Sequence, residues 1–240
     1  AAKEVLTVCM AEQSEQAGLD YYANVVIPAF ESKYPNVRVD FQLCGWGIDA
    51  IVTRYIAGKA PDVYQLGGDN LGSYLQMIAP LDHFTRDWED LKDFPKAILD
   101  GLSLDGKLLA IPFSMTTRSL TYRTDHFDSA GLAYSQVPTT WDELVQVARK
   151  LTRFDSSGNM LVQGFRTTNH WLHHAALLFQ AGGNYMDPAL TRFTFADTAG
   201  KEAVTFAQSL IKEWRVTSPG ILDGIDKGQA AMEYLTAGIL

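Results

Sequence analysis

Three histidines in one short segment have the spacing for metal chemistry: His170, His173 and His174. On a helix, His170 and His174 would lie one turn apart on the same face, as paired metal ligands do. The zinc-protease motif, however, needs a glutamate directly after the first histidine, and Trp171 stands there. No cysteine or acidic residue nearby completes a zinc ligand set. We therefore predict no metal and no cofactor, and we treat the histidines as polar residues at a helix start. A metal-binding protein that uses the His170–His174 cluster is kept as a further hypothesis.

Carboxylates in pairs can hydrolyse glycosidic bonds, and Glu12, Asp49 and Asp69 are candidates for such a pair. Because the two carboxylates need not be close in sequence, a carbohydrate-active hydrolase stays open as a hypothesis. Helix caps or solvated charges explain the same residues. Other enzyme motifs are missing: there is no Gly-x-Ser-x-Gly, and Gly67-Gly68-Asp69 fits neither glycine pattern of nucleotide-binding loops.

Four aromatic residues fall at or near predicted junctions between strand and helix: Trp46, Tyr64, Trp171 and Tyr185. An aromatic ring stacks on the C–H face of a sugar, and neighbouring Asp and Asn side chains pair with its hydroxyls. A single tryptophan is more often part of a core than a ligand contact. Two aromatic clusters, one on each side of a predicted hinge, favour a carbohydrate site.

Strands and helices alternate over the first 80 residues. Alternating and β-branched runs predict strands over 5–10, 37–43 and 62–66, and apolar residues at helical spacing predict helices over 14–34, 49–57 and 71–78. Pro28 should break or restart the first helix. This order predicts a parallel sheet with helices on its faces, where ligands bind at the carboxyl ends of the strands. Those ends lie at residues 12–14, 44–46 and 65–70.

The next stretch, residues 104–123, has the pattern of a connection between two lobes. Leu104-Asp105-Gly106-Lys107 predicts a tight hairpin, because Asp and Gly both accept positive φ angles. An apolar strand over 108–111 would be broken at Pro112. A polar cluster with Thr116 and Thr117 comes next, and then a second strand over 120–123. We interpret this stretch as a hinge strand with a ligand cleft beside it.

The pattern then starts afresh with helices predicted over 125–130, 141–151, 170–181 and 199–214, and a strand over 161–165. Thr140 and Glu143 have the spacing of a capping box. We therefore predict an N-terminal α/β lobe at 1–113, a hinge crossover at 114–123 and a partial C-terminal α/β lobe at 124–240.

Cys9 and Cys44 end two successive predicted strands. If these strands are neighbours, the two sulfurs could form a disulfide in an oxidising compartment. Two buried free thiols explain the residues equally well.

Composition narrows the function. The 240 residues are 47% hydrophobic and carry a formal charge of −8, with no cluster of Lys and Arg, so nucleic acid is excluded as a partner. The longest apolar runs are too short to span a bilayer, which predicts no direct membrane insertion.

Short motifs in a fixed order carry a family resemblance. They are Leu6-Thr7-Val8 with Glu12, 27–31, 34–39, 58–64, 79–82, 105–113, 122–125, 130–132, 138–144, 182–183 and 227–232. In these motifs the chain resembles the family 1 extracellular solute-binding proteins, the maltose-binding-protein-like receptors of ABC sugar importers.

The resemblance implies a type II periplasmic-binding-protein-like α/β fold, in which two lobes with mixed, mainly parallel sheets are joined by hinge strands. It also implies an exported periplasmic or extracellular receptor, without catalytic activity, that closes on a carbohydrate and delivers it to the transmembrane subunits of an ABC permease. Family members continue well past the motif at 228–232, so we expect the second lobe and the hinge to be incomplete here. A receptor for a phosphorylated polyol or a polyamine is the alternative within this fold.

Ligand contacts carried over by position come from both lobes. The resemblance places them at Glu12, Gln13, Ser14, Trp46, Asp49, Gln65, Asp69, Asn70, Thr116, Thr117, Asn169, Trp171 and His173. The family often has an acidic residue near Thr116, and threonine there weakens that hydrogen bond. Which sugar is bound therefore stays open.

Overall fold

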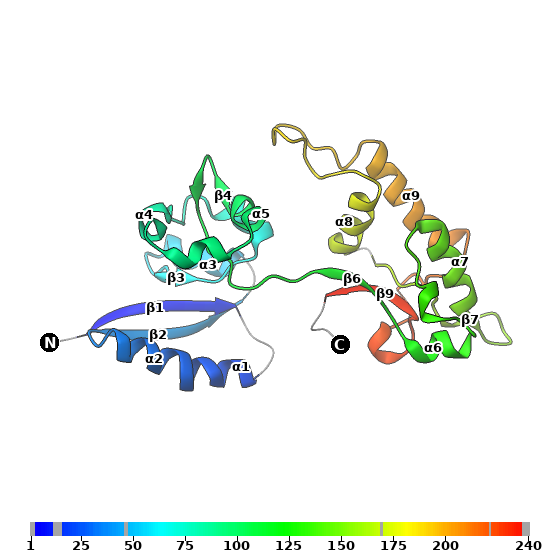
Figure 1. Ribbon diagram of the computed structural model, residues 1–240, viewed down its shortest axis with the longest axis horizontal. Coiled ribbons are helices and arrows are strands. Elements are labelled where there is room, and N and C mark those ends of the chain that lie inside the picture. Colours follow the sequence, from blue (N-terminus) through cyan, green and yellow to red (C-terminus); the bar gives the residue numbers. More distant parts are fainter. Residues whose placement is uncertain (1–2, 12–15, 46–47, 169, 221, 237–240) are drawn as a thin grey trace. The chain divides into compact units, whose positions relative to one another are not determined.

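A computed structural model describes residues 3–11, 16–45, 48–168, 170–220 and 222–236 (Figure 1). The chain forms two compact units, Ala1–Met115 and Thr116–Leu240. Each unit has its own cluster of buried apolar side chains. The hinge predicted over 114–123 stays a prediction.

Unit 1 is built on a three-stranded parallel sheet in the order β2-β1-β3. The strands are β1 (Glu4–Ala11), β2 (Val37–Cys44) and β3 (Val63–Tyr64). β1 pairs with β2 from Glu4 opposite Val37 to Ala11 opposite Cys44. The parallel sheet predicted from the βαβ order is confirmed, with a β3 shorter than expected.

One face of this sheet lies against a continuous helical segment (Figure 1). It consists of α1 (Gln16–Tyr21), a π-helical turn η1 (Tyr22–Val26) and α2 (Ile27–Lys33). Pro28 lies in the first turn of α2. Proline has no N–H and clashes with the carbonyl four residues before it, and the wider π turn takes up this disturbance without ending the helix. The predicted restart at Pro28 is therefore found as a local change of helix type.

The other face carries α3 (Ile48–Ile56) and η2 (Gly68–Tyr74), a 3-10 helix. Cys9, Cys44, Ile51 and Tyr74 form the buried cluster between them. The α-helix predicted over 71–78 is wrong. Gly67, Gly68 and Gly72 disfavour an α-helix, and the tighter 3-10 turn tolerates short irregular segments.

Short elements complete unit 1: α4 (Asp82–Thr85), η3 (Glu89–Asp93), α5 (Lys96–Gly101), β4 (Ser103–Leu104) and β5 (Lys107–Leu108). The predicted hairpin joins β4 and β5, and its central residues Asp105 and Gly106 have φ of 51° and 72°. Both angles are positive, as a type I′ turn requires. The strand expected over 108–111 is wrong: β5 ends at Leu108, and Leu109 N–H donates to Leu102 O as the last bond of this pairing.

Unit 2 contains an antiparallel pair, β6 (Arg118–Tyr122) and β9 (Met232–Thr236). Isolated parallel bridges join Gln163 to Ala230 and Arg166 to Glu233. The segment 163–166 thus lies along β9 in continuation of β8 (Met160–Val162), which pairs with β7 (Arg153–Phe154).

Helices surround these strands: α6 (Thr124–Ser129), η4 (Tyr134–Gln136), α7 (Trp141–Leu151), α8 (Trp171–Gln180), α9 (Thr198–Lys212) and η5 (Ile225–Lys227). The four α-helices match the predicted ones to within two residues at each end. The capping box is confirmed, since Glu143 N–H donates to Thr140 Oγ1 and the Glu143 carboxylate accepts from Thr140 N–H.

Gly164 allows the segment 163–166 to approach α7 closely. A Cβ at this position would lie 1.9 Å from the carbonyl oxygen of Ala148. Any side chain would therefore push the strand away from α7 and from the buried cluster that both elements share.

Candidate functional site

The carboxyl ends of the unit 1 strands carry a group of polar side chains. Asp49 lies in the first turn of α3, and Asp69 and Asn70 lie in η2; all three are exposed. Asn70 Nδ2 donates to Asp69 Oδ1 at 3.4 Å. Gln65 follows β3, where its N–H donates to Cys9 O and its side chain is half-buried. The structure thus places these four predicted residues at one end of the sheet.

Tyr74 lies near two of these carboxylates and was not predicted from the sequence. Its side chain is 2% exposed. Burial raises its pKa, and the charges of Asp49 and Asp69 raise it further. Both carboxylates therefore lie close to the same phenol. Neither carboxylate is buried. This half-site is suited to accepting hydrogen bonds from hydroxyl groups.

Five predicted contacts lie outside the described residues: Glu12, Gln13, Ser14, Trp46 and Asn169. Of the remaining unit 2 positions, Thr116 and Thr117 are exposed and directly precede β6.

The first turn of α8 presents an aromatic ring and a histidine. Trp171 is 49% exposed, whereas His173 is 5% exposed. The Nδ1 atom of His173 accepts a hydrogen bond from Thr168 N–H at 3.0 Å. Burial, followed by the charges of Arg118 and Arg166, lowers the pKa of His173 to about 4. At neutral pH the ring is uncharged and carries its proton on Nε2, which makes that atom a hydrogen-bond donor.

Two arginines near His173 were not predicted. Arg166 forms an ion pair with Glu233, whose side chain is almost fully buried. Arg118 Nη1 donates to the backbone oxygen of Tyr234 at 3.0 Å, and none of the described carboxylates lies within salt-bridge distance of Arg118. Arg166 and Glu233 are 67 residues apart. No local pattern could have indicated this pair.

The three histidines of the metal hypothesis have separate roles. His170 caps α8, with its Nδ1 accepting from Leu172 N–H at 3.3 Å. His173 bonds to Thr168 as above, and the ring of His174 lies 6.1 Å from that of Tyr185. Among the described residues, no three metal-ligating side chains gather into a group.

A disulfide joins Cys9 on β1 to Cys44 on β2, with 5.8 Å between their Cα atoms. Cys9 lies opposite Gln42 and Cys44 opposite Ala11, so the bond links positions two residues apart in register. It lies at the same carboxyl ends of the strands as the polar half-site.

Within the described residues, none of the helices combines the length and apolar character needed to cross a bilayer.

Comparison with known proteins identifies solved structures whose fold matches nearly the whole of this chain. A Listeria monocytogenes ABC substrate-binding protein in complex with cycloalternan superposes with a TM-score of 0.80 at 23% identity, covering 98% of this chain and 61% of that one. A Thermotoga lettingae ABC transporter solute-binding protein bound with α-D-tagatose gives a TM-score of 0.78 at 25% identity, covering 98% and 62%.

A curated binding protein of Brucella abortus is 30% identical over 146 residues, which make up 59% of this chain and 34% of that protein. The chain therefore spans about a third of this relative in the alignment and about three fifths of the two solved structures.

The family model described as bacterial extracellular solute-binding protein matches residues 13–237, nearly the whole chain. This match agrees with the parallel sheet of unit 1, the mixed strand pairing of unit 2 and the fold of the two superposed structures. The chain belongs to the bacterial extracellular solute-binding protein family.

Proposed function

We propose that this protein is the exported receptor of an ABC importer, that it captures a carbohydrate with residues from both units, and that it delivers this ligand to the membrane permease without altering it. The observation that carries the proposal is Trp171, a half-exposed indole in the first turn of α8. The relative bound with α-D-tagatose supports the ligand class.

The chemistry of the two half-sites suits a sugar. A pyranose offers a C–H face, which stacks on an indole, and hydroxyl groups that both donate and accept hydrogen bonds. Asp49 and Asp69 can only accept in their ionised form, while Asn70 and His173 can donate. Together these groups match a neutral ligand with many hydroxyls better than an apolar one.

The test is isothermal titration calorimetry of the protein with a panel of monosaccharides and oligosaccharides, repeated with Trp171→Ala. Loss of the stacking surface should weaken binding about tenfold, which corresponds to 1.4 kcal/mol. Trp88→Ala is the matched control, because Trp88 is 38% exposed, packs on Phe94 and lies outside both half-sites. The proposal fails if no sugar gives a binding heat, or if both variants bind like the unmodified protein.

A second candidate is a phosphorylated polyol, and Arg118 is the observation that favours it. This guanidinium has only a backbone partner among the described residues, and a second arginine, Arg166, lies near the same histidine. Because Glu233 already neutralises Arg166, the uncompensated charge here is that of Arg118, which suits a phosphate and disfavours a polyamine.

Glycerol 3-phosphate in the same calorimetric panel distinguishes the two candidates. Binding that weakens steeply with salt and is lost in Arg118→Gln would favour the phosphorylated ligand, since charge-assisted contacts are screened by ions. Binding of neutral sugars alone would exclude it.

A further inference from the structure

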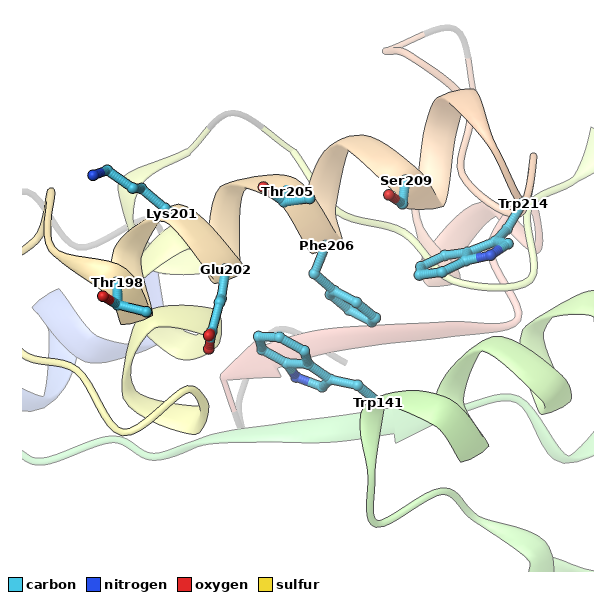
Figure 2. A pocket seen from close by; sticks show the side chains of 8 residues that line it. All are labelled: Trp141, Thr198, Lys201, Glu202, Thr205, Phe206, Ser209 and Trp214. Carbon is cyan, nitrogen blue, oxygen red and sulfur yellow. The ribbon is translucent and has the colours of Figure 1, made fainter.

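A groove with an aromatic floor runs along α9 in unit 2. It is remote in sequence from the predicted ligand contacts of unit 1, and the other predicted contacts lie in unit 2 itself. Its volume is about 460 Å³, within the range of roughly 300–1,000 Å³ seen for small-molecule sites. The lining residues are Trp141, Thr198, Lys201, Glu202, Thr205, Phe206, Ser209 and Trp214 (Figure 2). All belong to α9 apart from Trp141, at the start of α7, and Trp214, just after α9.

Three aromatic rings make up the floor. Figure 2 shows Phe206 between Trp141 and Trp214. The rings of Trp141 and Phe206 stack at 4.2 Å with 15° between their planes, and Phe206 and Trp214 lie 5.5 Å apart at 58°. Phe206 is 7% exposed, so the two half-buried indoles supply most of the accessible aromatic surface.

The orientation of Trp141 is held by a hydrogen bond to the last residue of α8. Its Nε1 donates to Gln180 Oε1 at 2.8 Å, and Gln180 Nε2 donates to the hydroxyl of Tyr234 at 3.0 Å. The indole N–H is therefore paired, and the ring is held by both this bond and the stacking on Phe206. A surface fixed in this way loses little conformational entropy when a ligand packs on it.

Polar side chains along α9 border this floor. Thr198, Glu202, Thr205 and Ser209 recur at helical spacing on one side of the helix, and none of their side-chain oxygens is hydrogen-bonded to another described residue. The hydroxyls can donate and accept, and the carboxylate can accept. Glu202 extends from α9 on the same side as Phe206 (Figure 2). Lys201 adjoins Glu202, so the border carries no net charge and favours neither an anion nor a cation.

We propose that this groove is a second carbohydrate site, which binds a single neutral sugar ring by stacking on Trp141 and Trp214 and by hydrogen bonds to Glu202, Thr205 and Ser209. An uncharged ring with one C–H face and several hydroxyls is the ligand class that matches a fixed aromatic floor with a neutral, unpaired polar border. The site lies wholly within unit 2 and does not depend on the function proposed above.

The test uses the protein labelled with 5-fluorotryptophan and followed by ¹⁹F NMR. The chain has five tryptophans, at 46, 88, 141, 171 and 214, and Trp→Phe substitutions assign their signals. Titration with methyl α-D-glucopyranoside and with maltotriose should shift the Trp141 and Trp214 signals saturably, with a dissociation constant on the order of 1 mM. Glycerol, which has hydroxyls but no ring, should leave both signals in place.

Two variants complete the experiment. Glu202→Gln should raise the dissociation constant read from the Trp141 signal several-fold, because an ionised acceptor makes stronger hydrogen bonds than an amide. Glu213→Gln, an exposed acid at the end of α9 outside the groove, should leave it unchanged. The proposal is overturned if the Trp141 and Trp214 signals do not move with either sugar, if glycerol moves them equally, or if the two variants behave alike. A sugar that shifts Trp171 alone would support the function proposed above and still overturn the second site.

Discussion

Arg166 and Glu233 form an ion pair across two neighbouring strands, and they are also the two partners of a parallel β-bridge. Glu233 is 1% exposed, and its second carboxylate oxygen accepts from Ile225 N–H at 3.4 Å. The carboxylate thus links the segment 163–166, β9 and η5. Its charge is compensated by Arg166 within the described part of unit 2.

Arg166→Ala should destabilise unit 2 by about 3–5 kcal/mol, because it leaves a buried carboxylate without its partner. Arg192→Ala is the control: Arg192 pairs with Asp197 on the surface, where loss of an ion pair costs less than about 1 kcal/mol. Urea unfolding measures both values. Equal small losses in the two variants would show that Glu233 does not need Arg166. The double variant Arg166→Met/Glu233→Leu should recover most of the stability.

Reduction of the Cys9–Cys44 disulfide should destabilise unit 1. The bond closes a loop with a sequence separation of 35, for which the chain-entropy model gives roughly 3–4 kcal/mol. Unfolding of the protein with and without a phosphine reductant measures the difference. Cys9→Ala/Cys44→Ala serves as control, since its stability should not respond to the reductant. An unchanged midpoint for the unmodified protein would contradict the expectation.

Thr140→Ala should destabilise α7 by about 1 kcal/mol, because Glu143 N–H then loses its acceptor at the helix N-terminus. Thr140→Ser keeps a hydroxyl and should remain close to the original stability. Hydrogen bonds from Thr139 hold the pKa of Glu143 below its usual value, so the contribution of this carboxylate should fade as pH falls through its lowered pKa. Thermal unfolding of both variants checks that Thr140→Ala is the less stable one, and equal stabilities would refute the role of the cap.

His173 should make the protein less stable in acid. Its pKa of about 4 in the folded chain lies below the ordinary value of 6.5, so between these values the unfolded chain binds the extra proton. Stability therefore falls as pH drops from about 6.5 towards 4, and is unaffected by this group at higher pH.

His173→Asn replaces Nδ1 by an amide oxygen that can accept from Thr168 N–H but does not titrate. Its loss of stability between pH 7 and pH 5 should be smaller than that of the unmodified protein by on the order of 2 kcal/mol. His83→Asn, at an exposed histidine, should keep the full loss. If all three proteins respond to pH alike, His173 is not the group responsible.

Local sequence signals predicted the local features well. Asp105-Gly106 requires positive φ angles and forms the expected turn, and Thr140 with Glu143 forms the expected cap. The βαβ order was enough to predict the parallel sheet, because successive strands of β-branched residues separated by helices pair side by side.

Features set by distant contacts could not be predicted. The segment 71–78 has apolar residues that fit a helix, but Gly72, the preceding Gly67-Gly68 and the burial of Tyr74 favour a 3-10 turn. Leu109 to Ile111 have strand composition without a strand partner in the described structure. Tyr74, Arg118 and Arg166 gain their place near the half-sites only through tertiary packing, and no spacing in the sequence marks them.

The π turn at Tyr22–Val26 holds one more residue than an α-helical turn would. Tyr22 lies within this turn, stacked on Phe41 at 5.5 Å and 18°. Deleting one residue between Val25 and Ile27 would let the segment close up into an uninterrupted α-helix, with α1 in nearly the same rotational position relative to α2, because a π turn covers about the same rotation with one residue more. The stack of Tyr22 on Phe41 would then persist. The π turn thus adds one residue to the helix without changing which side chains of α1 meet the sheet.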